Sequence, residues 1–173
     1  MEKIKDVLCA GCKSLSFSVL GKPVPQARPR FGNGWAYDKK ESREYKKIVH
    51  DAAQEAVITN NWIMAHEEMP IRMTLVIYKP IPDYRPQWYK KAAIAGFVAP
   101  LKRTGDIENI AKGIMDAMSG LVYKDDAQVY SLTLEQRYAE EPHVDVFVDA
   151  LFVNNGDVKD AVSRRVVLSH EML

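Results

Sequence analysis

The feature that most constrains the fold of this chain is the alternation of apolar and polar residues in four separate segments. Residues 15–20, 71–78, 128–136 and 143–153 each place apolar side chains at alternate positions. In the last segment these are Val144, Val146, Val148, Ala150 and Phe152. A period of two is typical of a β-strand with one face against a core and the other in solvent. The four segments therefore predict a sheet with one apolar face that another layer must cover.

Two amphipathic helices are predicted to supply that layer. Residues 39–59 and residues 106–118 repeat apolar side chains at helical spacing, with polar residues between them. A short helix is predicted over residues 86–96, opened by Pro86. A last amphipathic helix is predicted in the tail, through Val158, Val162 and Val166.

Strands and helices follow one another in mixed order along the chain. This order predicts an α+β fold: a single domain with a mixed β-sheet and helices mainly on one face. We assign residues 14–154 to the domain, residues 1–13 to an N-terminal extension and residues 155–173 to a C-terminal tail.

The composition is that of a globular protein. Hydrophobic residues make up 47% and charged residues 27% of the 173 residues, which argues against disorder and against a chain dominated by membrane spans. No stretch approaches the roughly 18 consecutive apolar residues of a transmembrane helix. Residues 1–7 lack the apolar core of a signal peptide, so we expect a cytoplasmic protein without a membrane partner.

The two cysteines, Cys9 and Cys12, form a single C-x-x-C pair. One pair supplies two ligands, whereas structural zinc takes about four. His66 or His143 would complete a zinc site only if folding brought them to the pair. We favour free reduced thiols, as is usual in the cytoplasm.

Positive charge is concentrated near the N-terminal part of the domain, although the whole chain has a net charge of only +1. Residues 22–47 contain eight basic and three acidic residues, a local net charge of +5. Within this stretch Arg28 and Arg30 lie in a proline-stiffened segment flanked by Phe31 and Trp35. Such a composition suits contact with phosphates and stacking on bases, but a surface loop that happens to be basic would look the same.

Four carboxylates lie at the ends of predicted elements. Asp106 and Glu108 start a helix, and Asp125 and Asp126 precede a strand. Each has a structural explanation, since Asp106 suits a helix N-cap, Glu108 can pair with Lys112 at i,i+4, and two aspartates suit a turn. Mg²⁺, however, is held by a few carboxylates together with water and substrate phosphate. An acid cluster beside a basic surface therefore indicates a phosphodiester-cleaving site, for which the four acids must converge.

The residues around these acids resemble a known family. Residues 104–112 read TGDIENIAK, residues 115–118 read MDAM, and residues 120–129 read GLVYKDDAQV. This resembles the core of the RusA family of Holliday-junction resolvases, in which D-(I/L)-D-N-(L/I)-x-K is followed by D-A-L and by a stretch ending in D-D-x-Q-(V/I). The run GKPVPQARPRF at residues 21–31 also resembles segments of that family.

The resemblance implies roles for particular residues. The metal-binding and catalytic acids of the family fall on Asp106, Glu108 and Asp126, with Asp125 as a further metal ligand, and its functionally important lysine falls on Lys112. The family typically has aspartate at the position of Glu108. Glutamate still offers a carboxylate, but its extra methylene moves the oxygens by more than a bond length unless the backbone compensates.

A second departure precedes the first acid. Thr104 and Gly105 stand where the family has Lys-Pro, and Lys102 and Arg103 are expected to supply positive charge there.

The resemblance implies a Mg²⁺-dependent endodeoxyribonuclease, with Mn²⁺ as an alternative metal and no small-molecule cofactor, in a bacterium or a phage. The expected substrate is branched DNA, a four-way junction, cut by in-line attack of water on a phosphodiester. Lys112 would neutralise charge developing on the scissile phosphate, and the DNA arms would be held by Arg28, Arg30, Lys102 and Arg103. A junction has approximate two-fold symmetry, so one site per chain predicts a homodimer.

Two alternatives stay open from the sequence. The first is a metal-dependent nuclease for other branched DNA, such as flaps or forks, which would use the same residues. The second is a DNA-binding module without catalysis, in which the four acids are only caps and turns.

Overall fold

The computed structural model describes residues 13–26, 30–32, 35–37, 39–100 and 106–151. The strands are β1 Lys13–Leu20, β2 Arg30–Gly32, β3 Trp35–Tyr37, β4 Ile71–Pro80, β5 Val129–Ala139 and β6 His143–Ala150. The helices are α2 Lys40–Thr59, α3 Gln87–Ile94, α4 Ile107–Met118 and the short 3₁₀-helix η2 Asp126–Gln128.

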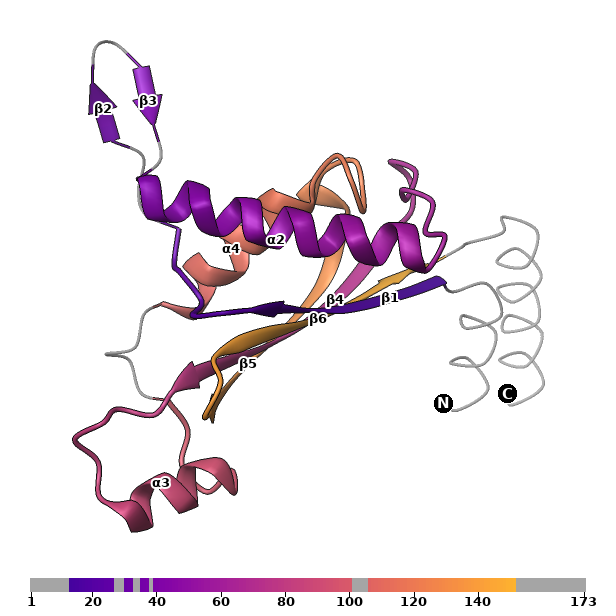
Figure 1. Ribbon diagram of the computed structural model, residues 1–173. Coiled ribbons are helices and arrows are strands. Elements are labelled where there is room, and N and C mark those ends of the chain that lie inside the picture. Colours follow the sequence, from indigo (N-terminus) through magenta and orange to yellow (C-terminus); the bar gives the residue numbers. More distant parts are fainter. Residues whose placement is uncertain (1–12, 27–29, 33–34, 38, 101–105, 152–173) are drawn as a thin grey trace, which may run out of the picture.

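Four strands form the main sheet in the order β1-β6-β4-β5 (Figure 1). β4 pairs parallel with β5, whereas β6 pairs antiparallel with both β1 and β4. The sheet is therefore mixed, and together with its helices it confirms the predicted single-domain α+β fold.

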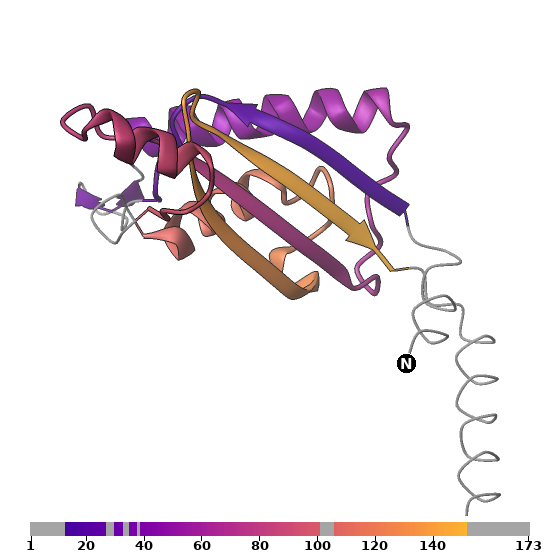
Figure 2. The same cartoon turned by 90° about the horizontal axis from the view of Figure 1, so that it is seen from below.

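Helices α2 and α4 contact each other and cover one face of this sheet (Figures 1 and 2). Their buried residues recur at helical spacing, which is why each helix presents one apolar stripe to the strands. The core between the layers includes Val49, Ala53, Ile110, Ile114 and, from the sheet, Leu15, Met73, Leu75, Val146 and Val148. This is the predicted arrangement, with helices mainly on one face.

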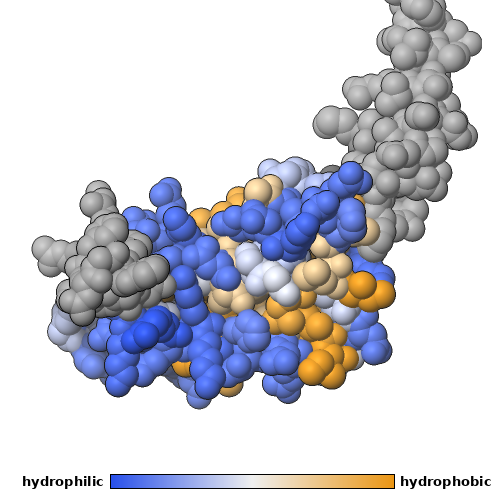
Figure 3. Space-filling view, turned by 90° about the horizontal axis from the view of Figure 1, so that it is seen from above, coloured by the Kyte–Doolittle hydropathy of each residue, from blue (hydrophilic) through white to orange (hydrophobic). Residues whose placement is uncertain are grey.

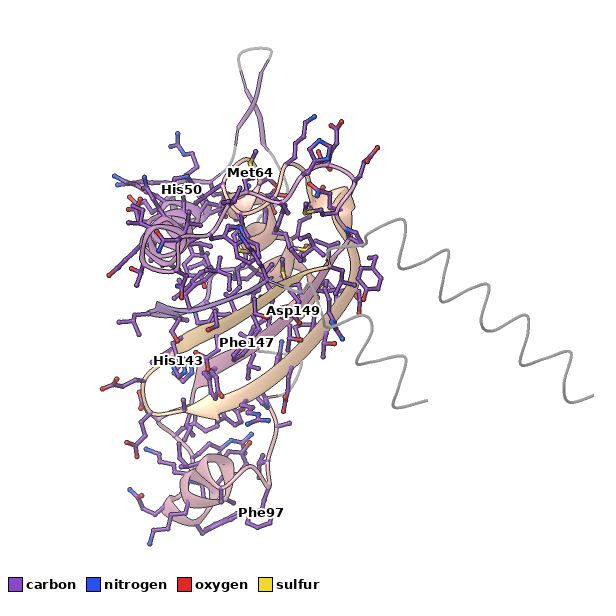
Figure 4. The ribbon with its side chains drawn as sticks, turned by 90° about the vertical axis from the view of Figure 1, so that its right-hand side faces the viewer. His50, Met64, Phe97, His143, Phe147 and Asp149 are labelled. Carbon is purple, nitrogen blue, oxygen red and sulfur yellow. The ribbon has the colours of Figure 1, made fainter. Side chains whose placement is uncertain are left out.

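The other face of the sheet has no helix over it in the part of the chain that the structure describes (Figure 1). It carries the other half of the alternation, including His143, Asp149 and the exposed apolar Phe147 on β6 (Figure 4). Ser14 and Ser18 on β1 donate hydrogen bonds across to Asp149 and Asp145, at 2.7 and 2.6 Å. The alternation in β1 and β6 thus separates a dry face from a wet one.

Helix α3 does not join α2 and α4. It lies at the end of the sheet where β4 and β5 finish (Figures 1 and 2). Its buried residues Tyr89 and Ala93 pack with Tyr138 near the end of β5, in a small cluster separate from the main core. The segment that contains α3 connects β4 to α4, so it leaves the main domain and returns to it.

The structure departs from the predicted elements in two places. β4 continues through Lys79 and Pro80, because β5 pairs alongside it as far as Ala139. The strand predicted over residues 71–78 therefore extends by two residues, and Pro80 is its last residue. A two-stranded hairpin, β2–β3, was not predicted.

Several predictions lie outside the described residues. They include the N-terminal extension up to residue 12, the C-terminal tail and the helix predicted through Val158, Val162 and Val166. Among the described helices, none is long and apolar enough to cross a membrane.

Candidate active site

The first pair of predicted site acids lies in the first turn of α4. Asp106 is the N-cap, and its Oδ1 accepts a hydrogen bond of 3.2 Å from the backbone N–H of Glu108. Its Oδ2 accepts a second bond, also 3.2 Å, from Nδ2 of Asn109. Both Asp106 and Glu108 are exposed. The backbone N–H groups at this helix end favour negative charge, so they hold Asp106 in place and leave its remaining lone pairs toward solvent.

The second pair lies in the turn before β5. Asp125 caps η2, and its Oδ1 accepts a hydrogen bond of 2.9 Å from the backbone N–H of Ala127. Asp126 is the first residue of η2 and is exposed. The predicted turn is therefore present, in the form of a short capped helix.

Gln128 organises this turn from beneath. Its Oε1 accepts hydrogen bonds from the backbone N–H groups of Lys124 and Asp125, at 2.8 and 3.1 Å. Its Nε2 donates to the backbone oxygens of His66 and Met69, at 2.7 and 3.0 Å. One side-chain amide, 9% exposed, thus ties the acidic turn to the segment that leads into β4. The sequence motif contained this glutamine, but its role is visible only in the fold.

The two acid pairs do not meet within one chain. Asp106 caps the start of α4, while Asp125 and Asp126 follow the turn at its other end. A helix of 12 residues is about 18 Å long at 1.5 Å per residue. No group of three or more histidine, cysteine, aspartate or glutamate side chains in the described ranges is placed to hold a metal ion. The expectation that the four acids converge inside one chain is therefore wrong.

The surroundings of Tyr123 show that the second acid pair lies near the C-terminal end of α4. Burial raises the pKa of the Tyr123 hydroxyl, and the negative charges of Asp126, Asp116 and Asp125 act in the same direction. That hydroxyl donates a hydrogen bond of 2.9 Å to the backbone oxygen of Met115, in the last turns of α4. The second acid pair therefore surrounds the C-terminal end of the helix.

Lys79 marks the other end, and sequence reasoning missed it. It is the last member of the buried series on β4, after Ile71, Met73, Leu75 and Ile77, and is 3% exposed. Burial lowers the pKa of the Lys79 ammonium, while the negative charge of Asp106 acts in the opposite direction. A lysine at the end of a strictly apolar alternation was the available signal.

Asp116 is a second residue with an unforeseen role. Its Oδ2 accepts a hydrogen bond of 2.9 Å from Nε2 of Gln26 and lies 3.1 Å from the Lys46 ammonium on α2. The backbone N–H of Gln26 also donates to the backbone oxygen of Asn109, at 3.0 Å. These contacts hold the segment at Gln26, which precedes the β2–β3 hairpin, against α4, the helix that Asp106 caps.

The predicted basic residues fall in different parts of the molecule. Lys112 is exposed on α4, one turn after Glu108. Arg30 is the first residue of β2, while Arg28, Lys102 and Arg103 lie outside the described residues. From the rest of the basic stretch, α2 exposes Lys40, Arg43 and Lys47.

The surface on the α2 side is largely hydrophilic (Figure 3). Apolar side chains gather toward one end of this view. Near the C-terminal end of α2 the exposed large apolar residues are Ile58, Ile63 and Met64.

The histidines considered for zinc lie far apart. The backbone oxygen of His66 bonds to Gln128, next to the start of β4, whereas His143 pairs with Tyr78 near the end of β4. His143 is instead stacked on the Tyr78 ring, with centroids 4.1 Å apart. The two rings therefore cannot join one site, and Cys9 and Cys12 lie outside the described residues.

Comparison with known proteins adds to this geometry. The family model described as endodeoxyribonuclease RusA matches residues 21–149, a range that holds every described site residue. The uncharacterized protein YqaN of Bacillus subtilis (strain 168) is 34% identical over 144 residues, which cover 78% of this chain and 94% of that protein. The chain belongs to the RusA endodeoxyribonuclease family.

Proposed function

We propose that this protein is a Mg²⁺-dependent Holliday-junction resolvase that works as a homodimer. The observation that carries the proposal is the state of two acids in the motif. Glu108 and Asp126 are exposed, and neither has a hydrogen bond or ion pair from its carboxylate within the described residues. An acid that caps nothing and pairs with nothing gains only the weak stabilisation that a helix N-terminus gives to negative charge, which favours a role toward an external ligand.

The hydrogen bonds of the four acids bear on the alternative of a DNA-binding module without catalysis. Asp106 and Asp125 do serve as caps, as a purely structural account requires. The i,i+4 pair between Glu108 and Lys112, which that account also requires, is not formed in the part of the chain described. Asp106 and Asp125 still have carboxylate lone pairs that can bind a metal ion, and each lies beside an acid without a partner in the described residues. This arrangement suits a metal site built on rigid elements.

The donor set fits Mg²⁺. Each end of α4 presents two carboxylates, Asp106 with Glu108 and Asp125 with Asp126, and Mg²⁺ is usually bound by one or two carboxylates plus water and substrate phosphate. When bound, the ion would polarise the scissile phosphate and stabilise the leaving oxygen. Lys112, exposed one turn beyond Glu108, would neutralise charge that develops on the phosphate.

A homodimer reconciles the separated pairs with one site. In a two-fold symmetric dimer whose α4 helices run in opposite directions, the start of one α4 lies beside the end of the other. Asp106 and Glu108 of one chain would then face Asp125 and Asp126 of the second copy. Symmetry produces two such sites, which suits the two matched cuts that a four-way junction needs.

The direct test is incubation of the protein with a synthetic four-way junction, with Mg²⁺ or with a chelator. We expect paired, symmetric cuts that yield nicked duplexes only when Mg²⁺ or Mn²⁺ is present. Forked and flapped substrates of the same arm sequences serve as controls for specificity. Equal cutting of flaps and junctions would leave a branched-DNA nuclease of other specificity, and metal-independent binding without cuts would leave a DNA-binding module.

A second prediction concerns the basic run. We expect the double variant Arg28→Ala/Arg30→Ala to bind junctions and duplexes more weakly by a similar factor, because phosphate contacts carry no sequence or branch information. The slope of log K against log salt should fall by about one for each lost phosphate contact. Lys13→Ala, an exposed change on β1, is the matched control and should leave the slope unchanged. An unaltered slope in the double variant would show that the run does not touch phosphate.

A further inference from the structure

The segment of residues 81–97 between β4 and α4 forms an arm with an unusual surface. Three large aromatic side chains are exposed on it: Tyr84 at 77%, Trp88 at 69% and Phe97 at 86%. Phe97 lies at the outer end of the arm, away from the sheet (Figure 4). Exposed rings gathered on one short element of a globular protein mark a binding surface more often than chance.

The arm is anchored at its base. Tyr89 and Ala93 pack against Tyr138 of β5, and the Tyr89 and Tyr138 ring centroids lie 6.4 Å apart at 66°. The backbone N–H of Phe97 closes the helix by donating to the oxygen of Ala92, at 2.9 Å. The exposed rings therefore project from a fixed platform, which lowers the entropy lost when they bind.

Ring and cation contacts connect the outer side chains to that platform. The Arg85 guanidinium carbon lies 4.4 Å from the Tyr89 ring centroid and 5.1 Å from that of Tyr84. Trp88 meets Tyr89 edge to face, with centroids 5.8 Å apart. Tyr84, Arg85, Tyr89 and Trp88 thus form one continuous row of flat groups, which we call the aromatic row.

The arm is also positively charged. Residues 81–97 contain Arg85, Lys90, Lys91 and a single acid, Asp83, so the arm has a net charge of +2. Arg85 has no carboxylate partner in the described ranges, and its Nε is buried without a hydrogen-bond partner there. The arm thus combines exposed aromatic rings with positive charge, which matches a partner that offers flat apolar rings beside negative charge.

The position of the arm relates it to the acid pair on α4. It leaves the sheet directly after Lys79, which feels the charge of Asp106, and the chain then returns to α4 at Asp106 itself. A partner bound on the arm therefore lies at the same end of the sheet as the first acid pair.

We propose that the aromatic row stacks on base faces exposed at the crossing point of branched DNA, while Lys90 and Lys91 contact the neighbouring phosphates. This rests on the proposed function, because it assigns a second contact to the same substrate. In an intact duplex the bases are stacked on each other, and separating them costs a few kcal/mol per step. At a branch point a base pair has an open face, so rigid rings can stack there without that cost. The arm would thus favour branched over linear DNA, which phosphate contacts alone cannot do.

The test compares branch preference in full-length variants. Tyr84→Ala/Trp88→Ala removes the exposed members of the aromatic row, Trp88→Phe keeps a ring, and Tyr130→Ala removes another exposed aromatic residue, on β5 and distant from the arm. A four-way junction carrying 2-aminopurine at the crossing point reports stacking, and relaxed closed-circular plasmid, which has neither ends nor branches, serves as the competitor.

We expect the double variant to lose junction affinity by about ten- to a hundredfold, with affinity for the plasmid changed less than about twofold. The 2-aminopurine signal of the wild type should be absent with the double variant and retained with Trp88→Phe and Tyr130→Ala. Lys90→Ala/Lys91→Ala should lower the salt slope by about one to two.

Failure of the two proposals is distinguishable. If wild type cuts the junction in Mg²⁺ but the double variant, folded by circular dichroism, keeps the same junction-to-plasmid ratio, the arm proposal is overturned and the resolvase proposal stands. If the wild type prefers the junction through the arm but makes no cut, the resolvase proposal is overturned and the arm proposal stands. Binding of the wild type to phosphatidylglycerol vesicles through Trp88, with no arm effect on DNA, would assign the arm to a lipid surface instead.

Discussion

Asp106→Asn and Asp126→Asn, each inactive alone, are expected to regain junction nicking when the two variants are mixed. Each substitution removes one negative charge from the proposed metal site, so each variant alone should nick at about one hundredth of the wild-type rate or less. In a mixed dimer whose sites combine the two ends of α4 from different chains, one site receives both substitutions and the other receives none. The intact site should nick one strand.

The expected recovery is partial and limited to single-strand nicks. Random exchange at equal concentrations makes half of the dimers mixed, each with one intact site, so nicking should recover to about a quarter of the wild-type level. Paired resolution should stay absent, because each mixed dimer has only one working site. The measurement is separation of nicked strands from resolved duplexes on denaturing and native gels.

The matched control is a mixture of Asp106→Asn with Glu108→Gln. Both changes lie in the same acid pair at the start of α4, so every site of their mixed dimer carries one substitution and no recovery is expected. Native mass spectrometry of a tagged and an untagged chain verifies that subunits exchange. If exchange occurs and the Asp106→Asn and Asp126→Asn mixture stays inactive, the site does not combine two chains.

Gln128→Leu should destabilise the fold by about 3 kcal/mol, since it removes four part-buried hydrogen bonds that each contribute about 0.5–1.5 kcal/mol. The side chain is of similar volume, so the loss reports hydrogen bonding and not a cavity. Four bonds disappear: those from the backbone N–H groups of Lys124 and Asp125, and those to the oxygens of His66 and Met69. Because the same bonds hold the turn with Asp126, the folded fraction should also nick poorly.

Urea unfolding at a fixed chain concentration measures this change, since the proposed dimer would make stability depend on concentration. Gln136→Leu is the matched control: it lies on the same strand, and its side chain has no hydrogen bond among the described residues. Its effect should stay within about 0.5 kcal/mol. Equal stability of the two variants would show that the hydrogen bonds of Gln128 do not stabilise the fold.

The sequence by itself determined the types of the elements and the family. Helices α2 and α4 and the strands β1, β4, β5 and β6 were predicted because hydrophobic period is a local property that each segment carries alone. Asp106 at a helix start and Asp125 in a turn followed from the same kind of local chemistry. The motif from residue 104 to residue 129 identified the family because its spacing is contiguous along the chain.

The tertiary structure alone decided which residues meet. No local pattern records which residues lie around each acid pair, because those neighbours are set by how α4 packs across the sheet. Nor does one show that Lys79 is buried at the end of β4, or that Gln26 reaches Asp116 across 90 residues of sequence. Periodicity fixes which face of an element is apolar, whereas distances between the ends of different elements depend on packing between them. For that reason the acids could be named from the sequence, but their surroundings in the folded chain could not.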